Sequence, residues 1–164
     1  MNLKIAVILF LMVISRNVFC QIGFIDNLTN WMGNWESTFK ISSGETCKEN
    51  LNIDWGYHNR FIKFDISGSN SGNSNYIYYS IEYITFNIDK QIAGFYMTDA
   101  GYDQLASITG NLKDEKVFLK LVSKTENFEE IWEYRDGKLH RTHNWKDEKT
   151  GMQETMEVIF NKKL

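Results

Sequence analysis

The chain has 164 residues, a formal net charge of −3 and no proline. This length suits one domain, which can bury roughly 70% of the surface of its unfolded chain. The acidic balance, with no basic block except the terminal Lys162-Lys163, argues against nucleic acid as a partner.

The N-terminus has the pattern of a signal peptide. Lys4 precedes an uninterrupted apolar run, Ile5–Ile14. A membrane-spanning helix needs about 20 such residues, so this run is too short to be an anchor. We therefore expect residues 1–20 to be removed by cleavage after Cys20. Residues 21–164 would then form one exported domain, secreted or periplasmic, with no transmembrane anchor.

The cysteines leave an alternative for the leader. Cys20 is either lost with it or retained as a lipid-modified residue, and the bulky Val18-Phe19 ahead of it favours loss. Cys47 is then the sole thiol of the domain, so it has no partner for an intramolecular disulfide. A lone thiol of this kind is expected to be buried and unreactive.

Beyond the leader, one short helix and about ten strands are predicted. Asp26–Met32 has a capping aspartate and apolar residues on one face, as a helix requires. From Trp35 onward, apolar and polar side chains alternate, which indicates half-buried strands. In chain order the expected strands are 35–42, 46–55, 60–66, 76–87, 91–98, 104–109, 116–123, 128–135, 138–146 and 152–160.

Short links between these strands predict an antiparallel, up-and-down arrangement. They include Asp89-Lys90, Asn111–Asp114, Asp136-Gly137 and Lys149–Gly151. A sheet of this size curls, and closure removes its edges, so an all-β barrel of about ten strands is expected. The polar segment Ser67–Asn75 indicates a long loop, either an ordinary surface loop or a mobile flap over a barrel mouth.

Several motifs resemble a known family. Gly33-Asn34-Trp35 is similar to the Gly-x-Trp start of calycin-type barrels, the group that contains lipocalins and fatty-acid-binding proteins. Tyr83–Asp89, Gly94–Asp99 and Ile108–Leu112 resemble a bacterial lipocalin-like family of domains of unknown function. The resemblance covers most of residues 26–160. It implies a calycin-type barrel with an internal cavity, and it brings no catalytic residues to this chain.

Haem-binding, nitrobindin-like barrels are relatives from which the sequence departs. After their Gly-x-Trp they carry a glycine-rich continuation, which Glu36-Ser37-Thr38-Phe39 replaces here. His143 lies on a late strand, where those barrels place an iron ligand. Because the glycines are missing, we expect no cofactor.

Charged residues on apolar strand faces are the most informative feature. Along the last three expected strands, every second residue is expected to face the interior. Four of these residues are ionisable: Glu130, Arg141, His143 and Glu154. Opposite residues of adjacent antiparallel strands lie about 5 Å apart, so matching registers would bring these four together.

A buried Arg141 must meet a carboxylate, because an unpaired buried charge costs several kcal/mol. Either Glu130 or Glu154 pairs with it and braces the barrel, or Arg141 and His143 bind an acidic or carbonyl head group of a ligand. A shifted register would instead turn all four side chains outward. Glu49 and Glu82 also interrupt apolar faces, which indicates cavity-facing or rim positions.

The many aromatic residues allow two interpretations. Trp35, Trp132 and others either fill a small barrel core or line a cavity for an apolar ligand. His140 and His143 fall on opposite faces of one strand, and Asp99-x-Gly101-x-Asp103 lacks a further acidic ligand, so no metal site is expected.

Three functions remain open from the sequence. The first is a non-enzymatic barrel that holds a small, mostly apolar or amphipathic molecule. Its expected binding residues are Arg141, His143, Glu130, Glu154, Trp35 and Trp132. The second is a cavity enzyme, an isomerase, cyclase or hydrolase, that uses His143 with Glu130 or Glu154 as acid and base. The third is a structural or protein-binding barrel, marked by an outward aromatic patch.

Overall fold

The computed structural model describes residues 28–41, 44–56, 61–71, 73–87, 89–99, 104–122, 127–146 and 150–163. The predicted signal peptide lies outside these residues. The chain divides into two units, Met1–Asn30 and Trp31–Leu164, and the second contains all the described strands. In the described part of the predicted short helix Asp26–Met32, the structure has a single 3-10 turn, η1 (Thr29–Trp31).

The described residues form ten strands that close into one antiparallel barrel. The strands are β1 (Gly33–Lys40), β2 (Thr46–Trp55), β3 (Ile62–Asn70), β4 (Asn73–Phe86), β5 (Gln91–Thr98), β6 (Gln104–Lys113), β7 (Lys116–Val122), β8 (Asn127–Arg135), β9 (Lys138–Lys146) and β10 (Gln153–Lys162). Each pairs with its neighbours in sequence, and β10 returns to β1 with Trp35 opposite Lys162. The predicted all-β, up-and-down barrel is therefore confirmed.

The predicted loop Ser67–Asn75 is wrong, and with it the idea of a flap. Strand β3 continues to Asn70, and β4 already begins at Asn73. Gly68 lies opposite Tyr78 across this pair, and Asn70 lies opposite Cys47 of β2. Serine and asparagine are common in loops, but here pairing with β2 on one side and β4 on the other holds them extended, with a register shift between Ser69 and Asn70 on the β4 side.

Turn chemistry explains which links were placed correctly. Asp136 and Gly137 both have positive φ, 54° and 75°, as the expected two-residue hairpin requires. A second tight turn, Asp114-Glu115, connects β6 to β7, with φ of 51° and 62°. The predicted link was Asn111–Asp114. No glycine marks this turn, and for that reason the extension of β6 to Lys113 was not predicted.

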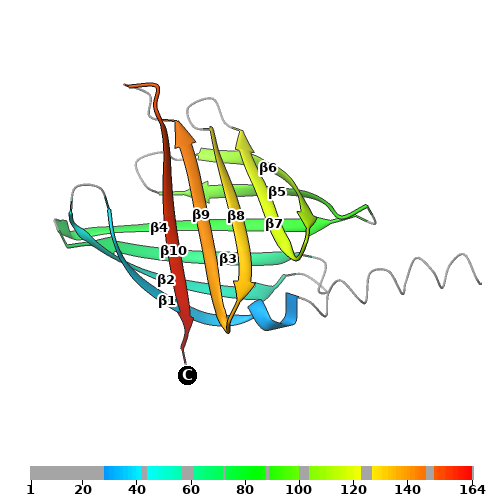
Figure 1. Ribbon diagram of the computed structural model, residues 1–164, viewed down its shortest axis with the longest axis horizontal. Coiled ribbons are helices and arrows are strands. Elements are labelled where there is room, and N and C mark those ends of the chain that lie inside the picture. The colour runs from blue at the N-terminus through cyan, green and yellow to red at the C-terminus, as the bar shows by residue number, and fades with distance from the viewer. Residues whose placement is uncertain are drawn as a thin grey trace, which may run out of the picture. The chain divides into compact units, whose positions relative to one another are not determined.

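The barrel interior differs at its two ends. At what we term the closed end, the inward side chains have no exposed surface: Trp35, Phe64, Ile84, Val117, Trp132, Leu139 and Phe160. At the opposite, open end, the inward side chains are only half-buried: Phe39, Tyr78, Tyr96, Phe128, His143, Trp145, Glu154 and Met156. Figure 1 shows β8, β9 and β10 passing in front of β2, β3 and β4, which directs inward side chains of these two groups toward one another.

Candidate functional site

A layer of ionisable side chains lies between the two ends. Glu49, Glu82, Glu130 and Arg141 have exposed fractions of only 3%, 2%, 4% and 6%. They come from β2, β4, β8 and β9, and the two-residue period of each strand turns them inward. Burial of four such groups is tolerated only where they satisfy one another, so their contacts decide what the site can do. We call them the buried cluster.

Arg141 is held by Glu49. Its Nη2 donates to both carboxylate oxygens, at 2.9 Å and 2.7 Å, and the hydroxyl of Tyr78 donates to the same carboxylate. Burial alone would lower the pKa of Arg141, but the charges of Glu49 and Glu130 raise it above its ordinary value. The expected pairing with Glu130 or Glu154 is therefore wrong. Glu49 reaches Arg141 from a strand that is not its neighbour in the sheet.

Glycine makes room for this arrangement. The ring of Tyr78 lies across Gly68 on the paired strand, where a β-carbon would overlap the ring. Burial, and then the nearby charge of Glu49, raises the pKa of Tyr78. Tyr78 therefore stays protonated and acts as a hydrogen-bond donor.

Glu130 is the second carboxylate of the buried cluster. It accepts a hydrogen bond from Trp132 Nε1 at 2.8 Å, and its other oxygen lies 2.9 Å from His143 Nδ1. Burial would raise the pKa of Glu130, but the bond with His143 and the charge of Arg141 outweigh it and lower the pKa. Glu130 is therefore ionised at neutral pH, and His143 Nδ1 carries the proton between the two groups.

Glu82 differs from the other carboxyl groups of the buried cluster in its protonation. Burial first, and then the charge of Glu130, raises its pKa well above the ordinary range. Glu82 is therefore an uncharged acid that hydrogen-bonds the Glu130 carboxylate. Its Oε2 atom is buried and has no partner among the described residues.

Two further buried atoms are unsatisfied. Within the described part of the chain, Arg141 Nε and Ser37 Oγ also have no hydrogen-bond partner. Ser37 lies opposite Glu49 in the β1–β2 ladder, so it belongs to the same layer. Buried polar atoms in native proteins nearly always bond to protein, water or a bound molecule. The site therefore has donor and acceptor capacity left for a small guest.

Aromatic rings line the open end above the buried cluster. Tyr96 meets Phe128 edge to face at 5.6 Å, Phe128 lies 4.4 Å from the His143 ring, and His143 lies 5.3 Å from Trp145. These residues alternate with solvent-facing ones on β5, β8 and β9. We call these four rings the aromatic wall.

The six residues expected to bind a ligand separate into groups. The structure brings Glu130, Arg141 and His143 into one layer, with Glu130 opposite His143 and Trp132 opposite Arg141 in the β8–β9 ladder. Glu154 faces inward at the open end opposite Trp145, whereas the carboxyl group that His143 contacts is that of Glu130. The remaining two, Trp35 and Trp132, belong to the fully buried interior. Contact of any of the six with a ligand stays a prediction.

Three residues of the site, Glu49, Glu82 and Tyr78, were not among the six predicted binding residues. Glu49 and Glu82 were recognised only as interruptions of apolar faces, and Tyr78 only as one aromatic among many. The available signal was the number of acids on apolar strand faces: four carboxyl groups, Glu49, Glu82, Glu130 and Glu154, against one arginine. That excess requires extra donors, which Tyr78, Trp132 and His143 supply.

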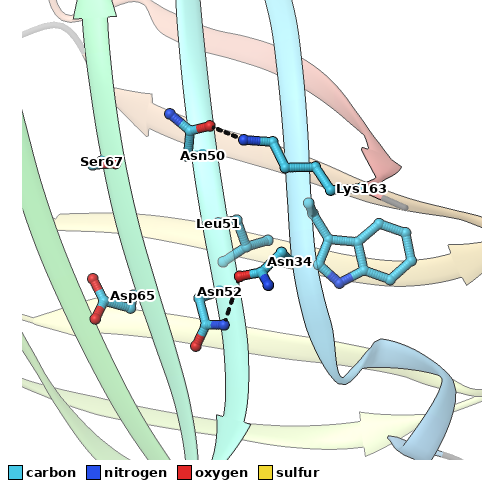
Figure 2. Close-up of a pocket in the computed structure, with 8 residues that line it drawn as sticks. Asn34, Asn50, Leu51, Asn52, Asp65, Ser67 and Lys163 are labelled. Atoms are coloured by element: carbon cyan, nitrogen blue, oxygen red, sulfur yellow. Dashed lines mark hydrogen bonds between the residues drawn. The ribbon is translucent and has the colours of Figure 1, made fainter.

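A second hollow lies on the outer face of β1, β2 and β3. Figure 2 shows this groove of about 440 Å³, lined by polar side chains such as Asn34, Asn50 and Asn52. Asn52 donates to Asn34 at 2.8 Å, and Lys163 donates to Asn50 at 2.6 Å. These groups satisfy one another at the surface and are separate from the buried cluster.

Other reactive features are few in the described residues. The expected burial of Cys47 is confirmed, and burial together with the charge of Glu49 raises the pKa of its thiol. Across the described ranges, no group of three or more His, Cys, Asp or Glu side chains is placed to hold a metal ion. The described segments contain no helix that is long and apolar enough to cross a membrane.

Together, the fold and the site define a ten-stranded antiparallel β-barrel with a buried ionic layer under an aromatic opening. No family model matches the chain. No curated protein matches it either. Among solved structures, a chain described as EF1p2_mFAP2b bound to DFHBI is similar, with a TM-score of 0.46 and 8% identity. The match covers 85% of this chain and 98% of that one. The assignment of a barrel rests on the strand pairing itself.

Proposed function

We propose that the barrel binds a small, mostly apolar molecule that enters at the open end and directs one polar group into the buried cluster. One observation carries this proposal: inward side chains are fully buried at the closed end and only half-buried at the open end. An interior packed for stability alone has no reason to leave large aromatic rings partly exposed on the inside.

The chemistry of the two layers supports the same function. Ligand sites are mostly apolar, with a few fixed polar groups that orient the guest. The aromatic wall supplies the apolar surface, and the buried cluster supplies polar atoms that Glu49, Tyr78 and Trp132 hold in place. A fixed polar layer needs little ordering when a ligand arrives, so less binding energy is lost.

Filling the interior is expected to abolish this binding. Ala106 points inward opposite Tyr96, so Ala106→Phe places a ring beside the aromatic wall. N-phenyl-1-naphthylamine, a neutral apolar dye, reports binding by increased fluorescence. We expect the variant to bind it at least about tenfold more weakly than the original protein, a loss of about 1.4 kcal/mol.

The matched control is Ala93→Phe, an identical change on β5 at an exposed, outward position. It should leave the dissociation constant of the dye unchanged. If both variants bind the dye as the original protein does, the dye lies outside the barrel and the proposed function is wrong. Circular dichroism of both variants checks that the barrel is intact.

We also propose that the protein is exported and that its leader is cleaved after Cys20. The support is the short apolar run Ile5–Ile14 behind a basic start. Mass spectrometry of the protein from its own host should give a chain that begins at Gln21. A mass that includes Cys20 with attached acyl chains would instead show lipid anchoring, and an intact Met1 would contradict export by this route.

A further inference from the structure

The buried cluster has a charge imbalance that bears on the ligand. It contains three carboxyl groups and one guanidinium, and that guanidinium already donates to both oxygens of Glu49. Arg141 Nε still has no partner among the described residues, but an acidic head group placed there would add a further negative charge to a layer that already holds three carboxyl groups, and like charges held close together are disfavoured. The expectation that Arg141 binds an acidic head therefore does not suit this geometry.

The unsatisfied carboxyl group of Glu82 indicates a ligand with a cationic rather than an anionic group. Glu82 is 2% exposed, and its Oε2 atom has no partner in the described part of the chain. Its other contact is with Glu130, a group of the same kind. Two carboxyl groups side by side resist ionising together, and Arg141, which favours the charged form of both, is bound by Glu49. A cation placed at Glu82 Oε2 would relieve the repulsion between the two carboxyl groups.

The aromatic wall suits the same kind of guest. Tyr96 lies directly opposite Glu82 in the β4–β5 ladder, and Phe128 contacts Tyr96 edge to face. Ring faces attract cations, and the attraction grows when water is excluded. A cationic group close to Tyr96, Phe128 and Glu82 would therefore be attracted both by the two rings and by the carboxyl group.

We propose that the ligand of this barrel carries a compact cationic head, such as a primary ammonium, that binds Glu82 Oε2 in the buried cluster with its apolar part against the aromatic wall. This inference rests on the proposed function and specifies the substrate class. The ammonium donates to Glu82, and Glu130 adds a second negative charge nearby.

Binding of a cation should release a proton from Glu82. The titratable or charged groups that surround this carboxyl are Glu49, Tyr78, Tyr96, Glu130, Arg141 and His143. Arg141 lowers the pKa of Glu82, but its charge is largely committed to Glu49. An added ammonium favours the carboxylate form, so the proton passes to solvent and affinity rises with pH as long as the amine stays protonated.

Three ligands that differ only in their head group test the charge. They are 2-phenylethylamine, phenylacetate and 2-phenylethanol, which are cationic, anionic and neutral at pH 7. Displacement of N-phenyl-1-naphthylamine gives their dissociation constants. We expect the amine to bind at least about tenfold more tightly than either of the others.

Glu82→Gln tests the residue. Glutamine has the shape of the protonated acid, so the barrel should fold, but it provides no negative charge. The amine should lose its advantage of about tenfold, while the affinity for 2-phenylethanol stays the same. The matched control is Glu129→Gln, on the outward face of β8 with a side chain 61% exposed, which should change neither value. Calorimetry in phosphate and in Tris measures the released proton.

Each outcome separates the two proposals. Tighter binding of the alcohol or the acid overturns the cationic head and leaves the binding barrel standing. An amine affinity that survives Glu82→Gln overturns the assignment to Glu82. If none of the three compounds nor the dye binds, both proposals are wrong.

Discussion

Replacing Arg141 with methionine is expected to lower the free energy of unfolding by about 3–5 kcal/mol, which is typical when one partner of a buried ion pair is removed. The substitution retains the apolar stem but leaves the Glu49 carboxylate buried without its counter-charge. It also removes a cation that lies 5.5 Å from the ring centres of both Trp132 and Phe160. Urea denaturation followed by tryptophan fluorescence measures the loss.

Two comparisons separate this charge effect from a general effect of the substitution. Lys120→Met breaks an exposed pair with Glu129, whose side chains are 60% and 61% exposed, and should change stability by less than about 0.5 kcal/mol. The double variant Glu49→Gln with Arg141→Met removes both charges of the pair and should recover much of the loss, while Glu130 loses only the nearby charge of Arg141 and keeps its bonds with Trp132 and His143. Equal stability of the original protein and the Arg141→Met single variant would show that the ion pair does not brace the barrel.

Truncating Trp132 to alanine should destabilise the barrel by about 3–5 kcal/mol, as expected for a large, fully buried ring. Trp132 has no exposed surface, packs against Phe64 at 5.1 Å and stacks on Phe160 at 5.9 Å. Its indole N–H also supports the Glu130 carboxylate. Trp145→Ala, at the half-buried open end, is the size-matched control and should cost less than about 2 kcal/mol.

Loss of Trp132 should also make the stability of the protein less dependent on pH. The pKa of Glu130 is lowered on folding, so this carboxylate stabilises the fold above its unfolded pKa and loses that contribution as pH falls through its folded pKa. Without the indole donor, the folded pKa of Glu130 rises, and less stabilisation is available. The stability difference between the original protein and Trp132→Ala should therefore be larger at neutral pH than below the folded pKa. An identical difference at all pH values would mean that only packing was lost.

The sequence by itself determined the parts of this protein that depend on neighbours in the chain. Alternation of side chains placed Glu130, Arg141 and His143 on the inner face, and Asp136-Gly137 fixed the register that sets Glu130 opposite His143. Both signals are local, because strand period and turn geometry act over a few residues. The closed, antiparallel barrel followed from the same regularity.

Only the tertiary structure decided which charges meet. Glu49 and Arg141 are 92 residues apart and belong to strands that are not adjacent, so no ladder register predicts their contact. Closure of the barrel brings them together, and the same closure places Glu82 beside Glu130 while Arg141 is bound by Glu49. The half-buried open end is likewise a property of how ten strands enclose a volume, since exposure inside a barrel depends on every side chain that faces it.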